Sequence, residues 1–103
     1  MSGLSEKTWK IIRKMYPAGP HDAIAELMVV ECGDNLPGLS KSNEIELERF
    51  RFAALKLSGG DVDKLLGAIS LAQLDWRDLL TGAGFAQSLT EHSKWADEYL
   101  GDG

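Results

Sequence analysis

Few side chains in this sequence have the chemistry of a nucleophilic centre. Cys32 is the single cysteine, and His21 and His92 are the two histidines that could serve it as a base. We expect Cys32 at the C-terminal end of a helix, between Glu31 and Asp34, where the helix dipole and both acids disfavour the thiolate. We therefore interpret Cys32 as a small packed thiol and assign no catalytic residue.

The spacing of potential ligands argues against a metal centre. The sequence has no H-x-x-x-H, H-E-x-x-H or EF-hand pattern, and its histidines fall on different predicted helices. A lone cysteine excludes both a Cys-based zinc cage and an intramolecular disulfide. P-loop and G-x-G-x-x-G motifs are also missing from the sequence, so we expect neither a metal nor another cofactor.

The segment DWRD at 75–78 is the most site-like part of the sequence. It gathers an indole, a guanidinium and two carboxylates within one turn, although helix capping would also explain an aspartate at 75. Near the end of the chain, a histidine and a tryptophan lie on the apolar face of another predicted helix, where a packed histidine is the commoner outcome. The candidate ligand site consists of Trp76, Arg77, Asp78, His92 and Trp95.

A helix at about 43–58 is expected to form the centre of the fold. On a helical wheel its apolar residues fill two roughly opposite arcs, the broader one containing Phe50 and the narrower one containing Phe52. Two arcs indicate either a helix covered on both sides or one with a side kept for a partner. Charged residues border the narrower arc, as a polar rim borders an interface. The predicted partner-binding residues are Ile45, Phe52 and Leu55.

Periodicity and capping signals place the other helices around this one. Ser88 and Glu91 form an S-x-x-E capping box for the last helix, and the LMVV run at 27–30 fits either a helix or a strand. We predict an all-α compact bundle of five or six short helices in a single domain over 1–103, with 1–4 and 101–103 frayed. The expected helices besides the central one are at about 6–16, 20–32, 62–74, 76–83 and 88–100.

Charge is unevenly distributed along the chain. Residues 1–19 hold four basic residues and one acidic residue, giving +3, so the remainder must carry −8 to reach the net −5. We expect the two parts to attract each other and the acidic body to exclude nucleic acid. The helices at 62–74 and 76–83 could imitate a helix-turn-helix, but aspartates flank the only arginine of the second.

The sequence also has few of the features that are typical of membrane proteins. No apolar stretch approaches the roughly 20 residues of a membrane span, and the N-terminal residues lack the apolar core of a signal peptide. With one cysteine, this favours a cytoplasmic protein. The basic amphipathic helix at 6–16 could still lie on a membrane surface, although docking on its own core is more usual.

Three strings carry a resemblance to a known family: ECGDNLPGL at 31–39, RFRFAALKLSGGD at 49–61 and DWRDLLTGAGFA at 75–86, together with His92 and Trp95. They resemble a family of small uncharacterised bacterial proteins of about this length. The resemblance implies a bacterial cytoplasmic setting and no mechanism.

We therefore predict a non-catalytic domain that binds another protein, or a second copy of itself, through the helix at 6–16 or one face of the central helix. The alternative is a small-molecule binder or minor enzyme with an inter-helix pocket near Trp76, Arg77, His92 and Trp95.

Overall fold

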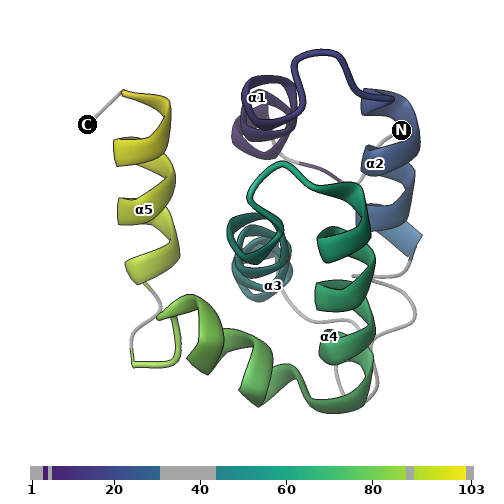
Figure 1. Cartoon of the computed structure of the whole chain (residues 1–103). Helices are drawn as coiled ribbons and strands as arrows, with labels where there is room; N and C mark the ends of the chain where they lie inside the picture. Colours follow the sequence, from purple (N-terminus) through teal and green to yellow (C-terminus); the bar gives the residue numbers. More distant parts are fainter. Residues whose placement is uncertain (1–3, 5, 31–43, 88–89, 102–103) are drawn as a thin grey trace.

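The computed structural model describes residues 4, 6–30, 44–87 and 90–101, without the side chains of 44–47 and 76. Its regular elements are all helices, which confirms the all-α prediction (Figure 1). In chain order they are α1 (Glu6–Met15), α2 (His21–Val29), α3 (Glu44–Ser58), α4 (Val62–Ala83) and α5 (Glu91–Leu100).

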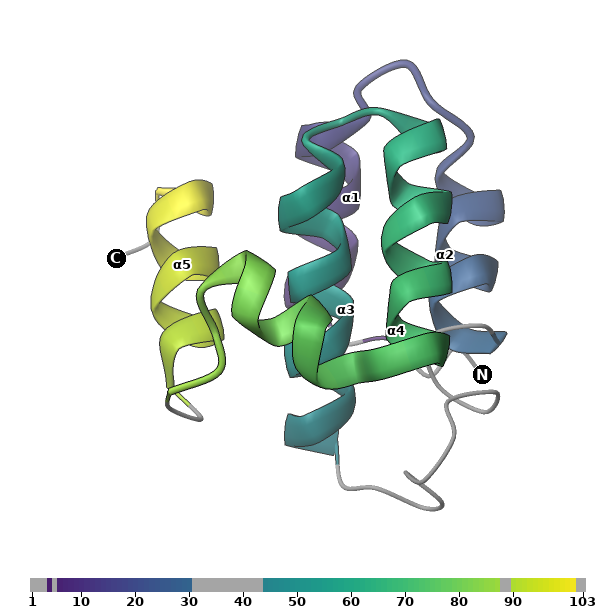
Figure 2. The same cartoon turned by 60° about the horizontal axis from the view of Figure 1, so that its bottom comes forward.

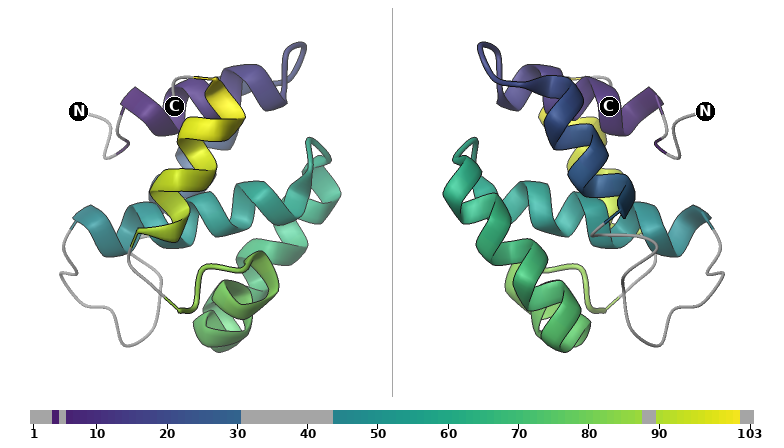
Figure 3. Two further views of the ribbon diagram at one scale, coloured as in Figure 1. Left: turned by 90° about the vertical axis from the view of Figure 1, so that its left-hand side faces the viewer. Right: turned by 90° about the vertical axis from the view of Figure 1, so that its right-hand side faces the viewer.

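Helix α3 is the centre of the structure, as predicted. It contacts α1, α4 and α5, and Figure 3 shows α1 and α2 on one side of α3 with α4 on the other. The side chains of Phe50, Phe52 and Leu55 are all 0% exposed, although they come from opposite arcs of the helical wheel. Helix α3 is therefore covered on both sides by its own chain.

Helix α4 is broken where the sequence predicted a boundary between two helices. Asp75 has non-helical dihedrals (φ −155°, ψ 93°), and its Oδ1 accepts a hydrogen bond from the Arg77 amide at 3.1 Å. After the break, the chain crosses in front of α3 toward α5 in the view of Figure 2. The predicted cap also holds at the start of α4, where the Asp61 carboxylate accepts from the Asp63 and Lys64 amides. Gly84 ends the helix with a left-handed φ of 83°.

Helix α2 resolves the ambiguity at 27–30 in favour of a helix. Leu27, Met28 and Val29 are helical, and Val30 is the C-cap residue with αR dihedrals. Ile24 and Met28 are buried, whereas Val30 is 40% exposed. The predicted extension of this helix to Cys32 lies outside the described residues.

Helix α1 uses its apolar face inside the protein. Ile11 and Ile12 are 0% exposed, whereas Trp9 and Met15 are only partly buried. Contact of this helix with a membrane surface therefore stays a prediction. On its basic side, Lys7 Nζ lies 2.6 Å from Asp97 Oδ1 of α5, as the charge distribution predicted. Within the described residues, no helix is both long enough and apolar enough to cross a bilayer.

The capping box predicted for α5 is wrong. The N-cap is Thr90, whose side chain makes no capping hydrogen bond, and Glu91 is the first helical residue. A capping box requires the glutamate at the third helical position, from which it can reach back to the cap amide.

Candidate functional site

Two cations of α3, Arg51 and Lys56, contact the C-terminal ends of two other helices. Arg51 Nε donates to the Met28 carbonyl oxygen of α2 at 3.2 Å, and Lys56 Nζ donates to the Ala83 carbonyl oxygen of α4 at 2.7 Å. The last turns of α2 and α4 contain no basic residue of their own. Terminal carbonyls need donors from elsewhere, and the α3 side chains supply them. The sequence prediction had placed Lys56 at the rim of a partner surface.

The predicted partner-binding arc is corrected by its burial. Phe52 and Leu55 are 0% exposed, and a side chain with no exposed surface offers no contact to a partner. The Phe52 ring packs against His92 and Trp95 of α5, with ring centroids 5.6 and 6.1 Å apart. The structure does not describe the side chain of Ile45.

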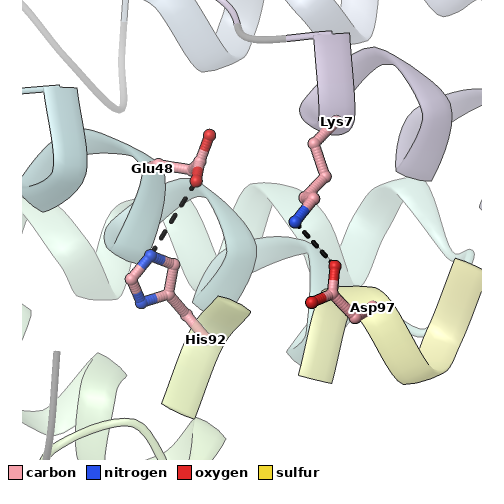
Figure 4. Close-up of polar contacts among 4 residues, drawn as sticks. All are labelled: Lys7, Glu48, His92 and Asp97. Atoms are coloured by element: carbon pink, nitrogen blue, oxygen red, sulfur yellow. Dashed lines mark hydrogen bonds and ion pairs between the residues drawn. The ribbon is translucent and has the colours of Figure 1, made fainter. Parts of the chain in front are cut away.

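His92 belongs to the same aromatic cluster. It is 2% exposed, and its ring lies 6.3 Å from the Phe85 ring. Its Nε2 is 3.9 Å from Glu48 Oε1 of α3 (Figure 4). A histidine so deeply buried cannot be a ligand group of an open pocket, so its main role is packing between α3 and α5.

Trp95 lies at the edge of this cluster and stacks on Tyr99, with ring centroids 5.4 Å apart and planes at 20°. It lines a shallow depression of about 300 Å³ with charged neighbours that include Lys56 and Glu98. Arg77 lines a different groove, with Arg49 of α3. Asp78 is exposed and lines neither of these, and the Trp76 side chain is outside the description. The described residues of the predicted ligand site therefore do not form one pocket.

The groove that contains Arg77 has a volume of about 340 Å³. Arg49 enters it from α3 with its guanidinium anchored, because Nε and Nη2 both donate to the Phe85 carbonyl oxygen, at 3.1 and 2.6 Å. Two arginines from different helices thus line one groove. Sequence reasoning singled out Arg77 but missed Arg49, because no local pattern links residues on separate helices. The lining residues are Arg49, Arg77, Leu80, Thr81 and Ala86.

A second open feature follows the outer side of α2. Two hollows of about 390 and 250 Å³ share the lining residues Glu26 and Val30, so they are neighbours along α2, and together they are named here the α2 groove. Trp9 of α1 closes one side of it. Its lining is mainly apolar, with acidic side chains on the rim. The residues are Trp9, Asp22, Ala23, Ala25, Glu26, Leu27, Val29 and Val30.

The remaining residues considered in the sequence analysis are the potential metal ligands, His21 and Cys32. Three or more potential metal ligands gather nowhere among these residues. His21 Nε2 contacts the Tyr16 carbonyl oxygen, which gives this histidine a local structural role. Cys32 lies outside the described residues, so the prediction for its thiol stays a prediction.

Comparison with protein-family models, with curated proteins and with solved structures finds no match for this chain. The resemblance carried by the three sequence strings therefore stays a prediction, and any functional argument rests on the surfaces that the structure presents.

Proposed function

We propose that this protein is a non-catalytic interaction domain that binds an amphipathic helix of a partner protein in the α2 groove. The observation that carries the proposal is the two-sided apolar character of α2. Its inner side contributes Ile24 and Met28 to the core. On the groove side, Leu27 and Val29 are partly buried and Val30 is 40% exposed. A helix that is apolar on both sides but covered on one is typical of a binding surface.

The grouping of apolar residues along two neighbouring hollows distinguishes this surface from the other exposed apolar residues. Leu74 is 85% exposed, more than any other large apolar side chain described, yet it lines none of the hollows described above. Single exposed apolar residues are ordinary in soluble proteins, whereas a continuous groove can bury a row of partner side chains. Apolar anchors spaced one helical turn apart suit such a groove.

Charged side chains on the rim of the α2 groove indicate which charge the partner helix should carry. Asp22 and Glu26 are exposed along α2, and the chain carries a net charge of −5. Arg13 of α1 lies over the Trp9 ring at 5.7 Å, on the side of the groove that Trp9 closes. An apolar helix flanked by lysine or arginine would complement the acidic side of the groove and would associate faster at low salt.

The experiment compares two variants that make the same charge change at exposed apolar positions. Val30→Arg places a cation inside the α2 groove, and Leu74→Arg places one on α4 outside it. Arginine at the C-cap of α2 also favours the helix dipole, so folding should persist. A partner should be isolated from source-cell extract on the immobilised parent protein, and its contact segment should be mapped by cross-linking.

We expect the mapped segment to be a basic amphipathic helix whose synthetic peptide binds the parent and Leu74→Arg proteins alike. Val30→Arg should weaken that binding by about tenfold or more, because it replaces an apolar contact by like-charge repulsion. Equal peptide affinity for both variants would remove the α2 groove as the binding surface.

A further inference from the structure

The outer side of α4, before its break, exposes a row of apolar side chains. Three of the large apolar residues that the structure shows as exposed lie here: Val62 at 37%, Leu66 at 44% and Leu74 at 85%. They are spaced at multiples of four residues, so together with Ser70 they form one ridge along the helix. The inner side of the same segment is buried and packs against α3. Ridges with this spacing fit into the grooves of a second helix.

Gly67 lies beside this ridge, and no contact among the described residues explains a glycine there. It is in the interior of α4 with helical dihedrals, where glycine is less favourable than alanine. A Cβ built at this position would meet no described atom within 4 Å. By contrast, a Cβ at Gly60 would lie 3.0 Å from the Met15 carbonyl oxygen, so the fold itself requires that glycine. A glycine on an exposed helix face suits the close approach of another backbone.

The charges near the two ends of the ridge indicate what would cover it. Lys64 and Asp75 are both exposed and lie eleven residues apart, which is about three helical turns, so they share one flank of α4. When two copies of a helix pack antiparallel about a two-fold axis, the same flanks meet, and Lys64 of each copy faces Asp75 of the other. A parallel pair would place like charges together. The antiparallel pair also sets Leu71 of one copy against Gly67 of the other, a large residue against a small one. The face is therefore complementary to itself.

We propose that the outer face of α4 binds the same face of a second copy of this chain, which gives an antiparallel two-fold dimer. One pair of helices is a small interface, so the dimer should be weak and reversible. The face shares no residue with the lining of the α2 groove, so dimerisation is independent of the proposed binding of a partner helix. The interface residues are Val62, Leu66, Gly67, Ser70, Leu71 and Leu74, with Lys64 and Asp75 at the edge.

Sedimentation velocity over a concentration series measures the dimer dissociation constant. Gly67→Ala tests the close approach, and Gly82→Ala is its control because Gly82 is the other glycine within α4 and lies outside the face. Both changes should raise the melting temperature of the dilute protein, since alanine favours a helix. Gly67→Ala alone should also raise the dissociation constant, by about fivefold or more, because a methyl group from each copy separates the two helices.

Neutralising the charged pair tests the antiparallel direction. Lys64→Gln and Asp75→Asn should each weaken the dimer, and asparagine still caps the helix after the break. The two changes together should weaken it little more than either alone, because both remove the same pair. Fully additive effects would overturn the antiparallel arrangement.

Arginine at an exposed apolar position gives a further comparison. Leu74→Arg puts a cation from each copy into the interface and should abolish dimerisation, whereas Val30→Arg in the α2 groove should dimerise like the parent. Circular dichroism checks that each variant is folded. A parent protein that stays monomeric up to about 1 mM would overturn the proposal. Equal dissociation constants for Gly67→Ala and Gly82→Ala, or for Leu74→Arg and the parent, would also overturn it.

Discussion

The guanidinium of Arg51 extends from α3 to the last turn of α2, where its Nε donates to the Met28 carbonyl oxygen at 3.2 Å. Arg51 is only 4% exposed, and Met28 is 0% exposed. This contact connects the central helix to the helix that lines the α2 groove. It therefore couples the stability of the core to the position of the proposed binding surface.

Substitution of Arg51 by methionine tests that coupling. Methionine keeps a long apolar side chain but removes the donor, so the buried Met28 carbonyl loses its charged partner. We expect a loss of about 1 to 3 kcal/mol in the free energy of unfolding, measured by urea denaturation. Arg13→Met on the exposed side of α1 is the control and should change stability by less than about 0.5 kcal/mol. Equal effects at both positions would show that the carbonyl contact contributes nothing.

The burial of both arcs of α3 gives a second prediction. Phe50 and Phe52 are each 0% exposed, so replacing either by alanine should destabilise the domain by about 3 to 5 kcal/mol. Analytical sedimentation should show no specific change in self-association for the folded fraction of either variant. If Phe52→Ala kept the parent's thermal stability while weakening self-association, the original expectation of a partner surface would be restored.

Local sequence patterns predicted the helices well because capping and periodicity act over short distances. Asp61 and Gly84 cap the two ends of α4 as expected, and Asp75 marks the break within the helix. The last helix is the exception. Ser88 and Glu91 have the spacing of a capping box, but the helix begins at Glu91. A motif of two residues is compatible with more than one start point, and the backbone conformation determines which one is used.

The candidate sites could not be predicted in the same way because they depend on contacts between helices. The apolar pattern of α3 allowed either burial or a partner surface, and only the packing of α5 shows that Phe52 is internal. Likewise, Arg49 and Arg77 are far apart in sequence, and only the packing of α4 on α3 shows that they line one groove. Helical periodicity describes the face on which a residue lies, but not the neighbour that covers that face.

The break in α4 gives a third prediction. Asp75 Oδ1 accepts a hydrogen bond from the Arg77 amide at 3.1 Å, as a helix cap does. Asp75→Ala should therefore lower the free energy of unfolding by about 1 kcal/mol, whereas Asp75→Asn should cost much less because asparagine also caps helices. Urea denaturation of both variants beside the parent measures the difference. Equal losses would indicate that the negative charge of Asp75, and not its capping oxygen, is required.

The buried hydroxyl of Tyr16 gives a prediction about alkaline pH. It donates to Ser58 Oγ at 2.7 Å, and Ser58 Oγ in turn donates to the Leu55 carbonyl oxygen at 2.7 Å. Burial raises the pKa of Tyr16 above its ordinary value of 10.0, because the tyrosinate is poorly solvated inside the protein. The unfolded chain therefore releases this proton at lower pH than the folded protein does.

It follows that Tyr16 stabilises the folded protein fully below pH 10.0. This stabilisation is lost as the pH rises from there through the folded-state pKa. Tyr16→Phe should cost about 0.5 to 1.5 kcal/mol at neutral pH through loss of the hydrogen bond. Above pH 10.0, however, its unfolding free energy should fall less steeply than that of the parent. The pKa of Tyr99 is also raised by burial, so both proteins should carry Tyr99→Phe, and urea denaturation should be measured from neutral to alkaline pH. Identical slopes with and without the Tyr16 hydroxyl would show that its ionisation does not limit alkaline stability.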